Sequence, residues 1–203
     1  MEWIKAFEAR VKKVEIVPLS FQSPSHVPCP TSHVPSTHDQ TTGLKLLYIG
    51  RLHPLKGVEY LLEAMPTDCK LVIIGKDEGE GKKLKKIAAR RGLDVEFRGI
   101  VSEAEKEAAY QWCDALVLPT LSENFGLVIA EALERGKRVI TTDGAPAWEP
   151  KEYETVELWK YGNMKIWKCM GGRLLYLKGY RDGAPEERVQ LLKKAIVELA
   201  CQF

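Results

Sequence analysis

The chain has 203 residues, of which 45% are hydrophobic and 29% charged, a composition typical of a globular domain. This length suffices for one domain with a sizeable core but not for two full α/β domains. The 30 basic and 28 acidic residues give a net charge of +2, which offers no case for nucleic-acid binding. No apolar segment approaches the ~20 residues that cross a bilayer. Met1–Lys5 contains a Glu and no apolar leader follows, which predicts a cytoplasmic protein without a secretory signal.

The composition divides the chain into three zones. Residues 1–17 predict a short amphipathic helix and a short strand, because apolar residues recur at helical spacing and then alternate. Residues 18–43 contain five prolines, and their only charged residue is Asp39, which predicts a linker. Residues 44–203 carry regular patterns and are the predicted folded domain.

Cysteine and histidine spacing predicts neither disulfides nor a metal site. The five cysteines form no CxxC pair, and their odd number indicates free thiols in a reducing compartment. Three of the four histidines fall in the linker, at spacings that match no ligand pattern: His26, His33 and His38. We therefore expect no bound metal.

Strand and helix patterns alternate from residue 44 onward. In chain order they predict a strand over 44–50, a helix over 58–65, a strand over 71–75, a helix over 82–91, a strand over 95–99, a helix from Ser102 with Glu105 completing a capping box, a strand over 114–119, a helix over 125–135, strands over 137–142 and 173–177, and a helix over 185–199. Most of these strand runs lack the alternation of a half-exposed sheet. The pattern predicts an α/β fold, a Rossmann-like parallel sheet with helices on both faces.

Ligands of such sheets bind at the carboxyl ends of the strands. The loop after the first strand, 50–57, carries Arg51 and Lys56 close to the start of the next helix. A guanidinium, an ammonium and a positive helix end suit a diphosphate. The alternative is a solvated basic loop, because the glycine spacing matches neither a Walker A motif nor GxGxxG.

The loop after the fourth strand carries two glutamates, Glu123 before the predicted helix and Glu131 inside it. The helix between them is almost wholly apolar, so Glu131 either lies at a polar pocket or on a solvated face beside Glu134 and Arg135. Gly126 would leave backbone N–H groups exposed near the helix start. After the third strand, residues 99–101 offer backbone groups to a planar base, or form only a turn.

Three of these loops, taken in order, carry a family resemblance. Gly50-Arg51 with Lys56-Gly57, then Phe97-Arg98-Gly99, then Glu123-Asn124-Phe125-Gly126-Leu127 with Glu131-Ala132 resemble the group 1 glycosyltransferases. These are retaining enzymes of the GT-B fold, and residues 44–200 resemble the C-terminal half, which binds the donor.

The resemblance implies roles for these residues. Arg51 and Lys56 would bind the donor diphosphate, Glu123 would contact the transferred sugar as the catalytic glutamate, and Glu131 would bind the ribose. The backbone of Asn124, Phe125, Gly126 and Leu127 would contact sugar and phosphate, and Gly99, Ile100 and Val101 would lie against the base. No metal or cofactor is implied, only a UDP-, GDP- or ADP-linked sugar as co-substrate.

The resemblance also implies an N-terminal acceptor domain, of which residues 1–17 look like a remnant. The chain would then be a fragment, a partner in a split enzyme or a degenerate remnant. The first hypothesis is a hexosyltransferase-type donor domain of polysaccharide or lipopolysaccharide synthesis. The second is a non-catalytic module that binds a nucleotide sugar or serves as the interaction subunit of a separate acceptor-domain chain. The six basic residues of 82–91 predict either contact with anionic lipid or a solvated face. Trp148, Trp159 and Trp167 suit sugar stacking or simple packing.

Overall fold

The computed structural model describes residues 43–149, 159–161, 164–169 and 172–200. All of these residues belong to one compact unit, Asp39–Phe203. The zones 1–17 and 18–43 that the sequence set apart lie outside the described residues, apart from Gly43. No described helix is long and apolar enough to cross a membrane.

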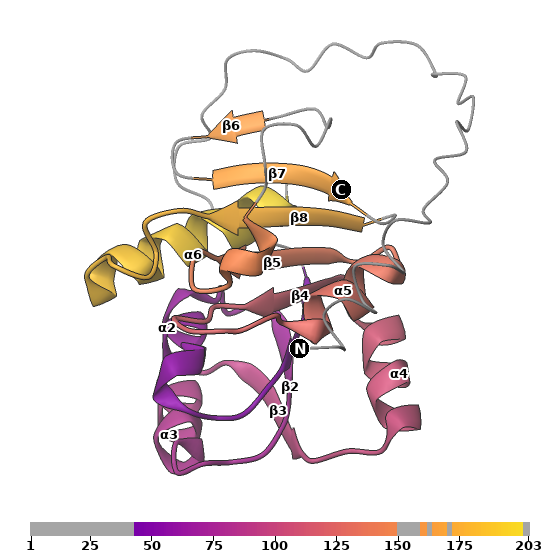
Figure 1. Ribbon diagram of the computed structural model, residues 1–203. Coiled ribbons are helices and arrows are strands. Elements are labelled where there is room, and N and C mark those ends of the chain that lie inside the picture. Colours follow the sequence, from indigo (N-terminus) through magenta and orange to yellow (C-terminus); the bar gives the residue numbers. More distant parts are fainter. Residues whose placement is uncertain (1–42, 150–158, 162–163, 170–171, 201–203) are drawn as a thin grey trace, which may run out of the picture. The chain divides into compact units, whose positions relative to one another are not determined.

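One sheet organises the described residues, with its strands in the order β3-β2-β1-β4-β5-β8-β7-β6 (Figure 1). The strands are β1 (Lys45–Ile49), β2 (Lys70–Ile74), β3 (Asp94–Gly99), β4 (Ala115–Leu118), β5 (Arg138–Thr142), β6 (Trp159–Tyr161), β7 (Met164–Cys169) and β8 (Gly172–Leu177). Strands β1 to β5 and β8 are parallel, as the apolar runs predict. Strands β7 and β6 add to β8 in antiparallel pairing, which the sequence pattern did not indicate.

Helices cover both faces of this sheet. They are α2 (Val58–Ala64), α3 (Gly81–Arg91), α4 (Glu103–Trp112), α5 (Leu127–Glu134) and α6 (Pro185–Ala200), with short 3-10 turns η1 (Pro54–Lys56) and η2 (Pro146–Trp148). Figure 1 shows α2, α3 and α6 on one side of the sheet and α4 and α5 on the other. The predicted capping box is present: the Ser102 hydroxyl accepts from the Glu105 N–H, and the Glu105 carboxylate accepts from the Ser102 N–H.

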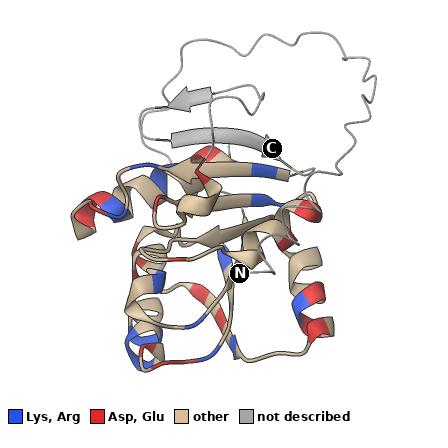
Figure 2. Ribbon diagram, in the orientation of Figure 1, with Lys and Arg blue, Asp and Glu red and all other residues tan. Residues whose placement is uncertain are grey.

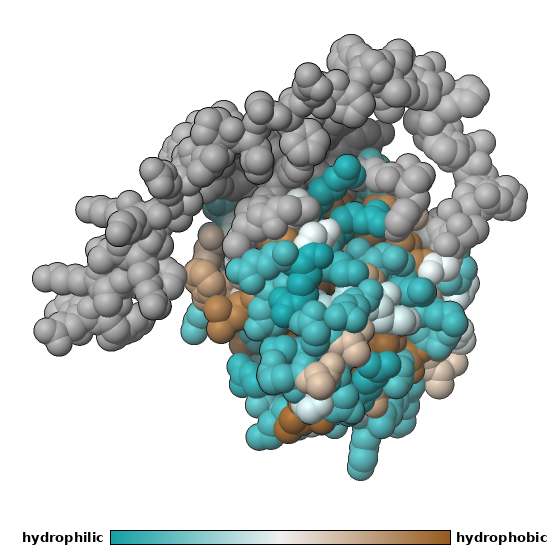
Figure 3. All heavy atoms as spheres, turned by 90° about the vertical axis from the view of Figure 1, so that its right-hand side faces the viewer, coloured by the Kyte–Doolittle hydropathy of each residue, from teal (hydrophilic) through white to brown (hydrophobic). Residues whose placement is uncertain are grey.

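The core lies between the sheet and these helices. Every residue of β4 is buried, and so are four of the five residues in β1, β2 and β5. Strand β3 differs, because its residues alternate between exposed and half-buried at the edge of the sheet. The face that carries α4 and α5 is mainly hydrophilic, with hydrophobic residues in small patches (Figure 3).

The helix predicted over 125–135 begins two residues later, at Leu127. The reason is Gly126, whose φ of 67° lies in the left-handed region and cannot continue into a right-handed helix. Residues 122–126 therefore form part of a loop at the carboxyl edge of the sheet. This difference places the whole Glu123–Gly126 stretch in the loop at that edge, and not in the helix.

Three glycines close the ends of neighbouring strands. Backbone hydrogen bonds continue past the strands, from the Gly50 N–H to the Ile74 carbonyl at 2.9 Å and from the Gly75 N–H to the Gly99 carbonyl at 2.7 Å. A Cβ atom on Gly75 would lie 1.9 Å from the Gly50 carbonyl oxygen, so no larger residue fits there. The three turns form a backbone floor made of Gly50, Gly75 and Gly99.

Candidate ligand site at the carboxyl edge of the sheet

The parallel strands β1 and β4 lie side by side in the sheet. Strands β2 and β3 are added on the far side of β1, and β5 on the far side of β4, so the order of strand addition reverses between β1 and β4. The loops that follow these two strands meet: the Leu121 N–H donates to the Leu55 carbonyl at 2.8 Å, and the Thr120 hydroxyl donates to the same oxygen at 3.2 Å. Gly57 permits this approach, since a Cβ there would lie 2.0 Å from the Pro119 carbonyl oxygen. Open α/β sheets bind their ligands at such a crossing point.

Lys56 and Glu123 meet at this point, 67 residues apart in sequence. The Lys56 Nζ lies 2.8 Å from Glu123 Oε2 and also donates to the Ser122 carbonyl at 2.8 Å. The ammonium has three N–H donors, and the described residues account for two of them. The Lys56 side chain is 11% exposed and that of Glu123 is 23% exposed, so the pair is largely shielded from water but still accessible to a ligand.

The Glu123 carboxylate is held in its ionised form. Burial alone would raise its pKa, but the hydrogen bond and the charge of Lys56, together with the backbone N–H groups of Asn124 and Gly126, outweigh burial and lower the pKa. Its second oxygen, Oε1, accepts from the Asn124 N–H at 3.0 Å. The site therefore presents a fixed anionic acceptor beside a cationic donor, which suits a ligand with both hydroxyl and phosphate groups.

Arg51 lies in the same loop as Lys56 but makes its ion pair elsewhere. Its Nη1 is 3.3 Å and 3.1 Å from the two carboxylate oxygens of Glu78, in the loop after β2, and its side chain is 60% exposed. The buried Tyr48 supports this loop from below, because its hydroxyl donates to the Arg51 carbonyl at 2.9 Å. Burial, and to a smaller extent the charge of Glu123, raise the pKa of Tyr48, so the hydroxyl stays protonated as a donor.

Glu131 is held against α4 and does not lie on a freely solvated face. Its Oε2 accepts from the Tyr110 hydroxyl at 2.8 Å and lies 3.5 Å from the Lys106 Nζ, while the side chain remains 32% exposed. Its helix neighbour Arg135 binds only its backbone carbonyl and pairs instead with Glu107. Glu131 is thus paired with side chains of α4 and remains partly exposed, and its role toward a ligand stays a prediction.

The remaining predicted residues lie at or after the carboxyl ends of β3 and β4. Four exposed large hydrophobic residues follow β1, β3 and β4: Leu55, Ile100, Phe125 and Leu127. Ile100 is 79% exposed, with Gly99 and Val101 on either side in the turn after β3. Phe125 packs against Trp148, with their ring centroids 5.9 Å apart. The structure does not show direct contact between these side chains and the Lys56–Glu123 pair.

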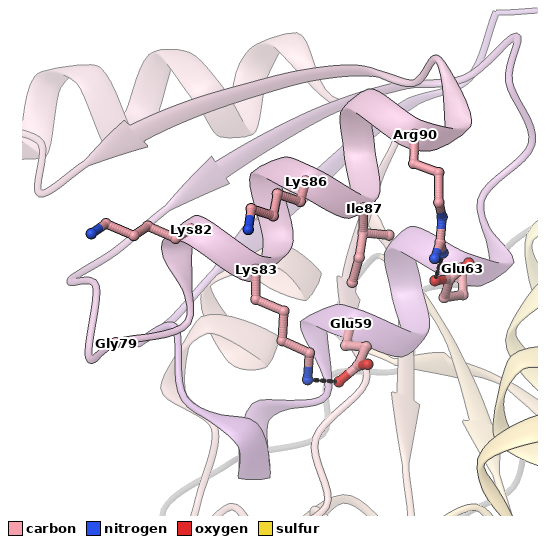
Figure 4. A pocket seen from close by; sticks show the side chains of 8 residues that line it. All are labelled: Glu59, Glu63, Gly79, Lys82, Lys83, Lys86, Ile87 and Arg90. Atoms are coloured by element: carbon pink, nitrogen blue, oxygen red, sulfur yellow. Dashed lines mark hydrogen bonds and ion pairs between the residues drawn. The ribbon is translucent and has the colours of Figure 1, made fainter.

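A separate groove of about 570 Å³ lies between α2 and α3, and Gly79 of the loop after β2 also lines it (Figure 4). In it Lys83 pairs with Glu59 and Arg90 with Glu63, while Lys82 and Lys86 point away from α2. Figure 2 shows the basic residues of α3 beside acidic residues of α2. The groove is thus an ion-paired contact between two helices, and much of the basic charge predicted for this helix is neutralised.

Sequence reasoning missed several residues that hold the site in place. Tyr48 supports the Arg51 loop, Glu78 pairs with Arg51, and Tyr110 orients Glu131. Glu78 and Tyr110 lie in other parts of the chain than Arg51 and Glu131, and the Tyr48 side chain contacts the Arg51 loop from the buried side of β1. A single-sequence pattern contains no signal for such contacts, except that Glu78 also follows a strand end.

A parallel sheet of this strand order, with helices on both faces, defines an α/β domain of the Rossmann-like class. The family model of group 1 glycosyl transferases matches residues 33–149, more than half of the chain, and the protein therefore belongs to that family. The phosphatidyl-myo-inositol mannosyltransferase of Mycobacterium tuberculosis is 34% identical over 109 residues, which cover 50% of this chain and 28% of the relative. The chain spans roughly a third of the length of the curated relatives that it resembles.

Solved structures agree on the fold. The C-terminal domain of a group 1 family glycosyl transferase, LpcC from Francisella tularensis, superimposes with a TM-score of 0.50 and 21% identity, over 79% of this chain and 86% of that one. Anabaena HepE in complex with UDP-glucose gives a TM-score of 0.52 and 24% identity, over 78% of this chain and 42% of the other. The described residues thus have the fold of the C-terminal, GT-B type domain, as the sequence motifs implied.

Proposed function

We propose that this protein binds a nucleotide sugar at the carboxyl edge of its sheet and provides the donor site for retaining sugar transfer in polysaccharide or lipopolysaccharide assembly. The observation that carries the proposal is the Lys56–Glu123 pair at the crossing point of β1 and β4. It joins a donor for phosphate to an acceptor for hydroxyls in one shielded place. The names of a mannosyltransferase relative and of a UDP-glucose complex support the class of ligand.

Each residue then has a chemical task. Lys56, with its third N–H donor, and the exposed Arg51 bind the diphosphate and stabilise its charge as it leaves. Glu123 accepts hydrogen bonds from sugar hydroxyls, and the N-terminus of α5 adds backbone donors from Leu127 onward. Glu131 accepts from the ribose hydroxyls, and residues 99–101 lie against the base. Neither a metal nor another cofactor has a task in this scheme.

The test is calorimetric titration of the full chain with UDP, GDP and ADP, and then with their sugar conjugates. We expect one base to bind in the micromolar to millimolar range. The variant Lys56→Met should weaken nucleoside diphosphates much more than the matching nucleoside. The matched control is Lys70→Met, which removes an exposed lysine 3.6 Å from Asp94. An equal loss for nucleoside and diphosphate would remove the diphosphate role of Lys56, and no binding of any nucleotide would refute the donor site.

Transfer also needs an acceptor held in line with the anomeric carbon. We propose that a separate acceptor-domain chain supplies that site. Copurification of such a chain, and restored transfer when the two are mixed, would support this. Donor binding that no added chain converts into transfer would favour the non-catalytic binding module instead.

We also propose contact with an anionic membrane surface, which rests on Lys82 and Lys86. Both are exposed and, among the described residues, neither forms an ion pair with an acidic side chain. Basic residues at an anionic surface contribute about 1 kcal/mol each. Cosedimentation with phosphatidylglycerol vesicles should fall when both lysines become glutamate, and equal binding to phosphatidylcholine vesicles would contradict the charge argument.

A further inference from the structure

The loop after β5 contacts the Glu123 loop at two points. The Glu123 N–H donates to the Gly144 carbonyl at 2.8 Å, and the indole N–H of Trp148 donates to the Phe125 carbonyl. Trp148 is itself fixed in η2, where its backbone N–H donates to the Ala145 carbonyl at 3.0 Å. The indole is half-buried and its ring packs on Phe125. Residues 123–126 are therefore held from one side by a neighbouring loop.

The second contact has a directional consequence. The structure contains no cis peptide bond among the described residues, and in a trans peptide the C=O and N–H groups point in opposite directions. When Trp148 fixes the Phe125 carbonyl, it also aims the N–H of Gly126 away from itself. Gly126 lies against the Glu123 side chain, since a Cβ on Gly126 would lie 3.4 Å from Glu123 Cγ. The interaction of the Gly126 N–H with the carboxylate also helps to lower the pKa of Glu123.

We infer that Trp148 is a positioning residue of the donor site: its indole N–H orients the Phe125–Gly126 peptide, and that peptide orients the Glu123 carboxylate toward the sugar. Trp148 contacts Phe125, and no direct contact with Lys56 or with the Glu123 side chain is found. Its effect is on the orientation of Glu123 and hence on recognition of the sugar, not of the nucleotide. The identity of the ligand rests on the proposed function, whereas the contacts between Trp148, Phe125 and Glu123 do not.

The experiment separates the effect of the Trp148 indole N–H from that of its aromatic ring. Trp148→Phe keeps an aromatic ring against Phe125 and removes the N–H, and Trp112→Phe is the matched control for a half-buried tryptophan in α4. Site-specific benzothienylalanine at 148 replaces the N–H with sulfur in the same ring shape, so the donor can be removed without leaving a gap. Two readouts are taken from the full chain.

The first readout needs no ligand. The pKa of Glu123, measured by carboxyl NMR with the signal assigned from Glu123→Gln, should move upward without the Trp148 donor and stay in place in Trp112→Phe. Amide exchange at Gly126 should also become faster. An unchanged Glu123 pKa together with unchanged Gly126 exchange would overturn the inference, whatever the protein binds.

The second readout tests the link to sugar recognition. The preference for the nucleotide sugar over the free nucleoside diphosphate should fall about fivefold, the effect of losing one hydrogen bond of ordinary strength. An equal loss for both ligands would show that Trp148 acts on the nucleotide and would contradict the inference. If the wild-type chain bound neither ligand, the proposed function would fail, while the first readout would still decide the role of Trp148.

Discussion

The Lys56–Glu123 pair makes a prediction that depends on geometry alone. Lys56→Met keeps most of the side-chain length and removes the ammonium, so the Glu123 carboxylate and the Ser122 carbonyl lose a donor 2.8 Å away. Hydrogen bonds to charged groups contribute about 1.5–3 kcal/mol, and the 23% exposure of Glu123 lets water recover a part. We expect a loss of about 2 kcal/mol in the free energy of unfolding at pH 7, or about 4–8 °C in Tm for a chain of this size.

The pH dependence supplies the sharper check. The folded state lowers the pKa of Glu123 below its ordinary value of 4.5. The stabilisation by the Lys56–Glu123 pair is therefore fully present above pH 4.5. It is lost as the pH falls through the folded-state pKa, because the protonated carboxyl carries no charge to attract the ammonium. The difference between wild type and Lys56→Met should be full at pH 7 and should shrink below pH 4.5.

Urea denaturation of both proteins across this pH range measures the difference directly. Lys70→Met is the control, since it removes an exposed lysine from a pair that contributes at most about 1 kcal/mol. A Lys56→Met difference that matches this control, or one that stays constant down to pH 3, would show that the pair does not contribute as the distances indicate.

Three further predictions concern other parts of the structure. Gly57→Ala should destabilise the protein by several kcal/mol, because the new Cβ would lie 2.0 Å from the Pro119 carbonyl oxygen. Gly92→Ala is the control: Gly92 also has a positive φ, but a Cβ there would have nothing within 4 Å, so the loss should be only about 1 kcal/mol. Equal losses of the two variants in thermal denaturation would contradict this prediction. Glu131→Ala should weaken nucleotide binding and also lower the Tm, because the buried Tyr110 hydroxyl loses its acceptor at 2.8 Å, and calorimetry that shows unchanged affinity despite the Tm loss would make the residue structural. Burial raises the pKa of the Cys113 thiol to about 11, so alkylation of the folded protein at pH 8, followed residue by residue by mass spectrometry, should be slow there, and rapid labelling would contradict the buried environment.

The regular part of the fold could be predicted because its signals are local. The apolar runs of β1 and β2 and the Ser102–Glu105 capping box each lie within a few residues of sequence, and all appear in the structure. The start of α5 was wrong by two residues, because apolar periodicity does not register the left-handed backbone of Gly126. Strands β6 and β7 were missed because their pairing with β8 is set by tertiary contact.

The candidate site divides in the same way. Its charged residues could be named from their positions after predicted strands, and the structure brings Lys56 and Glu123 together. Which residues pair could not be derived, because that depends on how loops and helices pack. Arg51 turns to Glu78, and Glu131 is held by Tyr110 across two helices. The roles of these residues toward a ligand stay predictions until binding is measured.

The floor formed by Gly50, Gly75 and Gly99 has a consequence for how such domains diverge. Its shape is set by main-chain atoms packed so closely that at Gly75 a Cβ cannot be added, so substitution there is blocked. The neighbouring Ile100 is 79% exposed, and no such packing limits its side chain. If the proposed donor site is correct, homologues could keep this backbone shape while differing in the base or sugar that they select, and changing that selection by mutagenesis should begin with exposed side chains such as Ile100.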